Sequence, residues 1–350
     1  MKRLALALAF GLGLASSACG PTFDSPAEVK ELRIFGIKKD KPYPAPNEDV
    51  ELRMLWHDPA HRQLTRTWFP LCINPPGDLY YGCFADPAFQ QGVVETLLSP
   101  GATDSDVFVP PDPIPADIID SRPAPQPGLP KYGLIFSFFA LCNGTLGPDL
   151  SPPEGALPLL CKDDAGKRLG PEDFIVGYAS MYVFPEKDRP GEYIRNQNPP
   201  LNGFEIAGHD ITDRTCIDAA CDPNAVLDEI DCAKPENDAV CFDACQDDGD
   251  STCPEIPIKP LFEAGFAERD DVSREYYDRD VGEQMWINYF VDRGSTKSEV
   301  RLLNDALEGP NENWGTSFYA PKDPGSVTIW AVARDNRGGT SWARTRVGIR

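Results

Sequence analysis

An odd number of cysteines constrains this chain more than any other feature. The 350 residues include eleven cysteines, and the first of them, Cys19, lies far from the others in sequence. The remaining ten lie between positions 72 and 253, an even number that disulfides can use completely. The role of the odd cysteine therefore bears on where the chain resides and on what stabilises its fold.

The first eighteen residues have the three-part pattern of an export signal. Lys2 and Arg3 supply positive charge, residues 4–14 are apolar, and residues 15–18 are small. An apolar core of eleven residues is too short for a membrane-spanning helix, which needs about 20. We expect residues 1–18 to be a signal peptide and the mature chain to be exported, without a transmembrane helix.

The small residues before Cys19 resemble the lipobox of bacterial lipoproteins, with Ser16 departing from the aliphatic residue usual in that family. The resemblance implies that Cys19 is acylated and anchors the chain in a lipid bilayer. Several acyl chains on one cysteine hold firmly, because each buried CH₂ contributes about 0.8 kcal/mol. Gly20, rather than aspartate, follows the cysteine, which in that family implies the outer membrane. The alternative is an ordinary secretory signal with a cysteine nearby.

The ten remaining cysteines are expected to form five disulfides in an oxidising compartment. Zinc is the alternative, but Cys216/Cys221 and Cys241/Cys245 only approach the spacing of zinc sites, and no C-x₂-C pair occurs. The predicted disulfide cysteines are Cys72, Cys83, Cys142, Cys161, Cys216, Cys221, Cys232, Cys241, Cys245 and Cys253. We favour sequential pairing for the first four, which allow three connectivities, and leave the pairing of the last six open.

Residues 210–255 are strongly acidic and rich in cysteine. They contain six cysteines, fourteen acidic residues and two cations, and so carry −12 of the net charge of −22. Such a segment has too few apolar residues for a hydrophobic core, so three disulfides must stabilise it instead. We interpret residues 212–255 as a stapled insertion. The overall negative charge also argues against nucleic acid as a partner.

Alternating apolar and polar residues predict many strands and few helices. Strand patterns occur at 31–37, 50–56, 66–72, 132–142, 174–184, 282–294, 299–305 and 315–321. Residues 100–130 contain nine prolines and are predicted to be an extended surface loop, because proline cannot donate to a sheet. Residues 325–350 predict a β-hairpin whose turn lies at 335–339. One face of its first strand would carry Val327, Ile329, Ala331 and Ala333, and one face of its second Ala343, Thr345, Val347 and Ile349.

The stretch from Trp330 to Gly339 resembles the strand and turn that precede the closing strand of immunoglobulin-like and PKD-like domains. Residues 42–56 resemble the opening strands of such a domain. The resemblance implies an all-β fold of tandem immunoglobulin-like sandwiches with long proline-rich loops and a disulfide-rich acidic insertion. We expect a lipidated tether over 19–29, a first sandwich over 30–197 and a second over 198–350.

Acidic and aromatic residues supply the candidate sites. Asp247, Asp248 and Asp250 surround a glycine and are weakly similar to calcium-binding loops, with a solvated acidic loop as the alternative. Calcium is the one cofactor that the sequence suggests. His57 and His61 flank Pro59, which argues against a helical metal site.

Trp314, Tyr276 and Tyr277 lie in polar surroundings typical of loop aromatics that bind proteins or glycans. Their alternative role is to cover the rim of a sandwich. The chain has no nucleophile elbow, phosphate-binding loop or dinucleotide-binding fingerprint. We therefore expect a membrane-anchored, non-enzymatic scaffold or adhesion module for a surface protein or glycan. The alternatives are a cell-envelope hydrolase and a calcium-dependent adhesin that uses residues 210–255.

Overall fold

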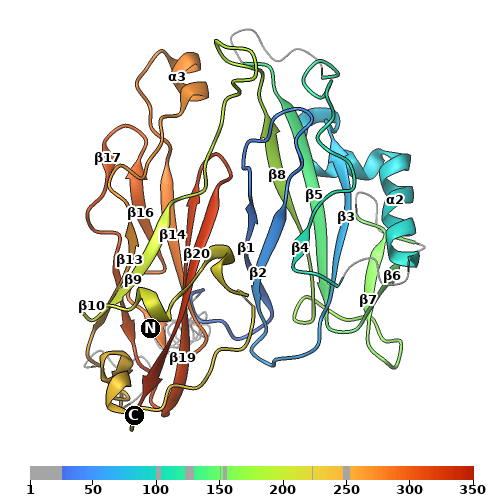
Figure 1. The fold of residues 1–350 in the computed structure, drawn as a ribbon. Helices are drawn as coiled ribbons and strands as arrows, with labels where there is room; N and C mark the ends of the chain where they lie inside the picture. Colours follow the sequence, from blue (N-terminus) through green and yellow to red (C-terminus); the bar gives the residue numbers. More distant parts are fainter. Residues whose placement is uncertain are drawn as a thin grey trace, which may run out of the picture.

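The computed structural model describes residues 26–99, 104–122, 130–149, 151–152, 156–222, 224–246 and 253–350. Antiparallel β-sheets form two halves that lie side by side, one from β1 to β8 and one from β9 to β20 (Figure 1). Each half contains two main sheets that pack face to face, and the first half also contains the small β6-β7 sheet. The expected all-β class of sandwich domains is therefore confirmed.

The first half encloses a core between two three-stranded sheets. Met54, Phe139 and Met181 face this core and are at most 4% exposed. One sheet contains β1 (Arg33–Lys39), β2 (Leu52–His57) and β4 (Val107–Phe108). The other contains β3 (Thr65–Ile73), β5 (Gly133–Cys142) and β8 (Phe174–Val183), in the order β3-β5-β8.

The outer face of the β3-β5-β8 sheet is covered by short helices and a small hairpin. The helices are η2 (Pro76–Asp78), η3 (Tyr80–Ala85) and α2 (Pro87–Leu98), and the hairpin is β6 (Thr145–Pro148) with β7 (Leu159–Lys162). Helix α2 begins where Asp86 accepts a hydrogen bond from the backbone N–H of Ala88 and proline occupies the first turn. Sequence reasoning did not predict α2.

The proline-rich segment packs more closely than an extended surface loop would. In its described part, residues 104–122, β4 pairs with β2, and Ile114 and Ile118 are at most 1% exposed against the core of the first half. From Pro110 onward its prolines lie outside the ladders, while its isoleucines close one side of the sandwich.

The second half is a larger sandwich around a core that includes Phe204, Tyr289 and Phe318. Its smaller sheet contains β10 (His209–Asp210), β9 (Leu201–Ile206), β13 (Ile256–Phe262), β18 (Thr316–Tyr319) and β15 (Ser295–Thr296). Its larger sheet contains β11 (Cys216–Ile217), β20 (Thr340–Ile349), β19 (Gly325–Asp335), β14 (Met285–Val291), β16 (Val300–Asp305), β17 (Gly309–Pro310) and β12 (Cys241–Phe242). Helix α3 (Asp271–Tyr277) precedes β14.

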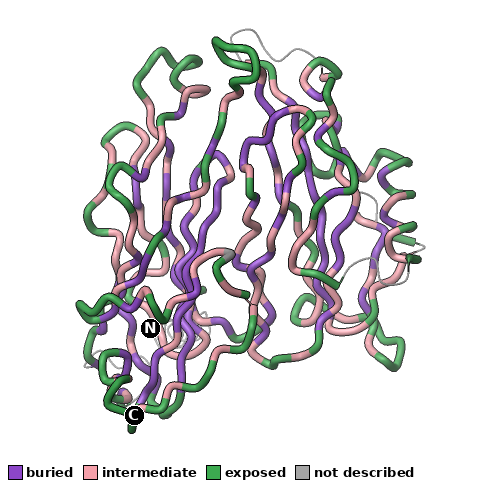
Figure 2. Tube along the Cα trace, viewed as in Figure 1, coloured by how far each residue is buried: buried purple, intermediate pink, exposed green. Residues whose placement is uncertain are grey.

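The β19–β20 hairpin is buried on both faces. The residues that the sequence assigned to one face of each strand lie in the second core or are fully buried, as predicted. The opposite face places Trp330 and Trp342 against Phe35 and Leu55 of the first half. The two halves therefore share a packed interface, which Figure 2 shows as buried strands through the middle of the molecule.

The predicted tether ends earlier than residue 29. Ala27 and Val29 are at most 1% exposed. The backbone of Val291, at the end of β14, accepts from the N–H of Val29 and donates to the carbonyl of Ala27. The described chain therefore begins by pairing with the larger sheet of the second half, and Cys19 and the first part of the tether lie outside the described residues.

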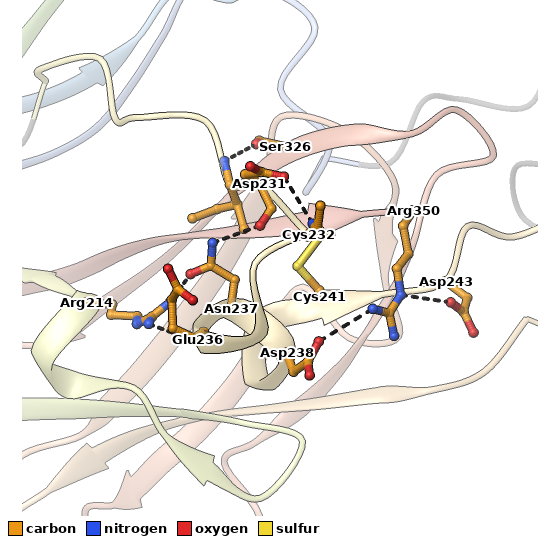
Figure 3. Close-up of a disulfide and its surroundings, with 12 residues drawn as sticks. Arg214, Asp231, Cys232, Glu236, Asn237, Asp238, Cys241, Asp243, Ser326 and Arg350 are labelled. Carbon is orange, nitrogen blue, oxygen red and sulfur yellow. Dashed lines mark hydrogen bonds and ion pairs between the residues drawn. A yellow bond between two sulfur atoms is a disulfide. The ribbon is translucent and has the colours of Figure 1, made fainter.

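The acidic insertion lies along the edge of β20. It pairs through β11, antiparallel at Cys216 and Arg344, and through β12, parallel at Cys241 and Gly348. Its short helices are η4 (Thr212–Arg214), η5 (Asp218–Ala220) and η6 (Pro235–Val240). Figure 3 shows Cys232 bonded to Cys241 beside ion pairs of Arg350 with Asp238 and Asp243. The insertion therefore completes a sheet edge of the second sandwich.

Ten cysteines form five disulfides between neighbours in sequence. The pairs are Cys72–Cys83, Cys142–Cys161, Cys216–Cys221, Cys232–Cys241 and Cys245–Cys253. The first two pairs are those that the sequence favoured. The sequence separations are 5 to 19 residues, so each bridge closes a short loop.

Candidate binding surface

Several predicted site residues lie outside the described part of the chain. These are Cys19 and the three aspartates proposed for calcium, Asp247, Asp248 and Asp250. Among the described residues, no group of three histidine, cysteine, aspartate or glutamate side chains is arranged to hold a metal ion. No helix in the described ranges is long and apolar enough to cross a membrane.

The aromatic residues predicted to contact partners have different surroundings. Trp314 is half-buried against the second core, and its indole N–H donates to the carbonyl of Pro260 at 2.8 Å. It therefore covers the sandwich rim, as its alternative role required. Tyr276 and Tyr277 at the end of α3 are 45% and 61% exposed, and their rings meet edge to face at 4.7 Å. This tyrosine pair is free to contact a partner.

A hollow of about 1170 Å³ lies beside α3 and is lined mostly by charged side chains of both signs. Two ion pairs lie in it: Lys187 bonds Asp271, and Arg269 bonds Asp280 at 2.9 Å. Its lining contains five basic and seven acidic side chains. The hollow therefore offers little net charge to a ligand, and exposed ion pairs of this kind contribute little.

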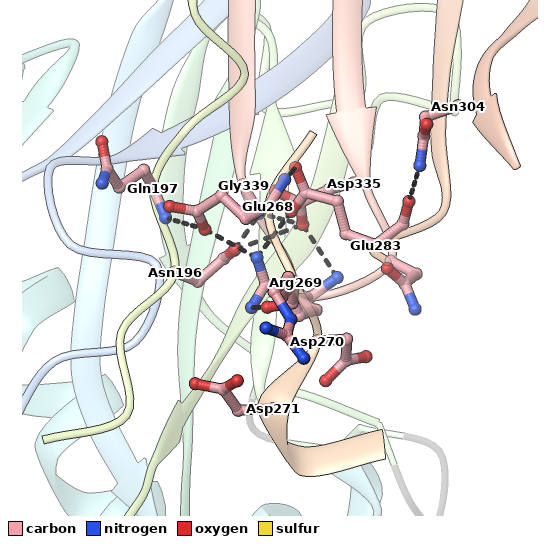
Figure 4. A network of polar contacts seen from close by, with 12 residues as sticks. Asn196, Gln197, Glu268, Arg269, Asp270, Asp271, Glu283, Asn304, Asp335 and Gly339 are labelled. Atoms are coloured by element: carbon pink, nitrogen blue, oxygen red, sulfur yellow. Dashed lines mark hydrogen bonds and ion pairs between the residues drawn. The ribbon is translucent and has the colours of Figure 1, made fainter. Parts of the chain in front are cut away.

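A buried polar network fixes the turn between β19 and β20. Arg337 donates to Glu283 at 2.7 Å and to Glu268 at 2.6 Å. Asp335 accepts from the backbone N–H groups of Arg337 and Gly339, both at 2.8 Å, so its charge is satisfied by the turn itself. Figure 4 shows Glu268, Asp335 and Gly339 converging there. The network holds the turn at residues 335–339 rigidly in place.

Beside this turn lies an open sheet edge formed by β8. Among the described strands, β8 pairs with β5 on one side and has no partner strand on the other. Asp173 directs its carbonyl toward the β5 side, to the N–H of Asn143 at 2.9 Å, whereas the carbonyl of Ser180 accepts from Lys39 on the opposite side. Since backbone groups alternate along a strand, the N–H and C=O of Val176 and Tyr178 also point away from β5.

An aromatic hollow of about 420 Å³ lies on the outer face of this edge. Tyr80 from η3 stacks on Tyr178 with ring centroids 4.7 Å apart. The disulfide between Cys72 and Cys83 fastens η3 to β3. We call this surface the aromatic patch; it comprises Leu79, Tyr80, Tyr81, Val176 and Tyr178, each 39–52% exposed.

A second hollow, of about 360 Å³, lies on the inner face of the same edge and is lined partly by Ile175, Gly177 and Ala179. Lys39 and Arg334 also line it. Arg334 donates to Asn288 at 2.6 Å and to the carbonyl of Phe35, both neutral acceptors. Burial lowers the pKa of Arg334 to about 10 and that of Lys39 to about 8. We call this space the cationic hollow.

The sequence contains a further signal for this site, beyond the alternation that predicts a strand at 174–184. The strand FIVGYASMYV has no charge and no proline, in a chain in which charged residues make up 25%. Natural sheets usually protect a free edge with such residues. An edge without them is a marker of a binding surface, although the sequence does not reveal that this strand lies at an edge.

Comparisons with known proteins leave the family of this chain open. No protein-family model matches it, and no curated protein matches its sequence.

Proposed function

We propose that this chain is an exported, lipid-anchored binding protein that holds a partner on the aromatic patch. The observation that carries the proposal is the clustering of five large apolar side chains, each 39–52% exposed, on η3, the residue before it, and β8. Single exposed apolar residues are ordinary on a soluble protein, whereas a contiguous group marks an interaction site. The proposal assigns no catalytic step.

The pairing of cysteines supports the anchor. Five disulfides use ten of the eleven cysteines and leave Cys19, directly after the small residues that resemble a lipobox. Intact mass of the protein extracted from membranes, with and without reductant, tests this part. We expect an acylated chain beginning at Cys19, with no thiol reactive before reduction. An unacylated chain, or several reactive thiols, contradicts it.

Crosslinking in the producing cell tests the binding surface. A photo-reactive amino acid replaces Tyr81, which is 52% exposed within the patch, and in a parallel strain replaces Tyr277, which is 61% exposed on α3. We expect a discrete crosslinked product from position 81 that decreases when Tyr178→Ser is added, because that substitution removes the stacking platform. Position 277 is the matched control.

The two positions separate the outcomes. Crosslinking at 81 alone supports the aromatic patch as the partner surface. Crosslinking at 277 alone transfers the function to the tyrosine pair on α3 and contradicts the proposal. Equal labelling of both positions by many proteins indicates nonspecific contact and also contradicts it.

A further inference from the structure

We propose that the partner presents an extended peptide segment that joins the sheet as a new strand along Phe174–Ala179 of β8. Its alternate side chains would be aromatic or aliphatic toward the aromatic patch and acidic toward the cationic hollow. The inference rests on the proposed function, since it specifies the ligand of the same surface. Strand addition of this kind draws affinity from backbone hydrogen bonds and selectivity from pockets for alternate side chains.

The backbone of β8 is available for pairing, whereas two other edges, at β20 and β3, are protected. The edge of β20 is covered by β11 and β12. Strand β3, at the other side of the same sheet, carries Pro70 and a register shift between Trp68 and Leu71. Both devices prevent strand addition, and β8 has neither a charged residue nor a proline.

The length of the open edge is limited at one end. Lys39 donates to the carbonyl of Ser180 at 2.9 Å, and Gly338 of the β19–β20 turn lies beside the same ammonium group. The turn and the lysine therefore close the edge at Ser180. The open part, residues 174–179, is long enough for a peptide of about six residues, close to the usual length of a strand.

Hollows on both sides of the edge match the alternation of a strand. Val176 and Tyr178 border the aromatic hollow, while Ile175 and Ala179 border the cationic one. Successive side chains of a strand point to opposite faces. A peptide paired with β8 would therefore place one set of side chains in each hollow.

Charge in the inner hollow favours an acidic side chain. Arg334 bonds only neutral oxygens in the described contacts, and Lys39 bonds a carbonyl. Asp335 also lines the space, but the N–H groups of its own turn satisfy it. Asp335 acts electrostatically on Lys39, so the lining carries two cations against one carboxylate. A carboxylate entering the hollow would meet this net positive charge, carried mainly by Arg334, and such pairing is strongest away from water.

A second copy of this chain is the competing occupant, because two β8 edges could pair with each other. Each copy carries a net charge of −22, and like charges of this size oppose association. We therefore assign the edge to a peptide of another protein.

Binding of a synthetic probe tests the inference. The probe is an end-blocked seven-residue peptide of alternating phenylalanine and aspartate, titrated by fluorescence anisotropy against the full chain. We expect saturable binding that weakens about tenfold or more, the effect of one or two lost hydrogen bonds, for Val176→Pro. The proline removes an N–H that points away from β5, so the β5–β8 ladder stays intact. Tyr277→Ser is the matched control and should bind normally.

Two changes in the peptide provide tests that do not depend on a variant folding. N-methylation of the amides that would face β8 should abolish binding. Lysine in place of aspartate should weaken binding about fivefold or more, through the cations of the inner hollow. Loss of binding with both changes supports strand addition with acidic selectivity.

Three results overturn the inference. The first is no binding of the probe while position 81 still crosslinks in cells, which leaves the proposed function standing and removes the ligand class. The second is binding that neither N-methylation nor Val176→Pro affects. The third is concentration-dependent dimerisation of the chain that Val176→Pro abolishes, which assigns the edge to a second copy.

Discussion

Gly177 lies opposite Phe139 in the β5–β8 ladder, and a Cβ on this glycine would lie 2.6 Å from the phenylalanine ring. Phe139 is 4% exposed, so its ring has little space to move. We predict that Gly177→Ala destabilises the fold by about 1–3 kcal/mol through overpacking. Denaturant unfolding measures the loss. Gly147→Ala, at a position with open space around its Cβ, is the control and should stay close to the wild type.

The Cys72–Cys83 disulfide should support both stability and the aromatic patch. It closes a separation of eleven residues, for which loop entropy gives about 3 kcal/mol. We predict that replacing both cysteines with serine lowers stability by this amount and speeds amide exchange in η3. The Cys216–Cys221 pair closes a separation of five residues and is worth about 2 kcal/mol. Its removal should leave exchange in η3 unchanged; equal acceleration by both double variants contradicts the assigned role.

His57 should make the interface between the halves sensitive to acid. Its ring lies 4.7 Å from that of Trp330, and burial lowers its pKa from 6.5 to about 4. The unfolded chain therefore takes up a proton at a higher pH than the folded chain. The contribution of neutral His57 to the free energy of unfolding is complete above pH 6.5. It is lost as the pH falls toward 4, which lowers the free energy of unfolding by roughly 2–3 kcal/mol.

The variant His57→Phe keeps an aromatic ring against Trp330 and does not titrate. We predict that its free energy of unfolding decreases less than that of the wild type between pH 7.5 and pH 4.5. Urea titrations at the two pH values provide the comparison. Equal decreases in both proteins would show that His57 is not the responsible group.

The buried pair of Arg337 and Glu283 provides another prediction. Both side chains are at most 4% exposed, and they lie 2.7 Å apart. Arg337→Met leaves the carboxylate without its cation and should cost about 3–5 kcal/mol. The backbone N–H of Glu268 also donates to Glu283, at 3.0 Å. Adding Glu283→Gln removes the charge but keeps this acceptor, and should recover part of the loss. A double variant no more stable than Arg337→Met contradicts this explanation.

Asn224 should join the acidic insertion to the first half. Its side chain accepts from the N–H of Trp56 at 2.9 Å and donates to the carbonyl of Met54 at 3.0 Å. We predict that Asn224→Ala costs about 1–3 kcal/mol, because the two bonds lie at a partly buried contact. Unfolding experiments measure it, and exchange at the amide of Trp56 should increase. An unchanged exchange rate at the Trp56 amide would show that this contact does not form in solution.

Strong alternation made most strands predictable within a few residues. The pattern at 132–142 became β5, and that at 174–184 became β8. Strand β13 was not predicted because Pro257 and Pro260 interrupt its pattern. The sheet tolerates Pro260 because it lies beyond the part of β13 that pairs with β18, where its carbonyl accepts from Trp314. It tolerates Pro257 because that residue lies beyond the part that pairs with β9, where its carbonyl accepts from the N–H of Ala207. Such tolerance depends on neighbouring strands, which a local pattern does not reveal.

The alternating pattern also does not predict which strands are buried on both faces. Leu55 stands where alternation predicts a solvent-facing side chain, yet it is fully buried against the second half. The same holds for the candidate site. The strand itself was predictable, but its position at an edge follows from strand order, and its stacking partner Tyr80 comes from a helix almost a hundred residues away in sequence.

Residue-resolved amide exchange of β8, with and without the alternating peptide, tests the central claim most directly. In the free chain we predict rapid exchange at Val176 and Tyr178, whose N–H groups point away from β5, and protection at Gly177 and Ala179. With saturating peptide, exchange at Val176 and Tyr178 should slow by about tenfold or more, while Tyr277 stays unchanged. Protection of Val176 and Tyr178 in the free chain, or no change on saturation, would contradict the account.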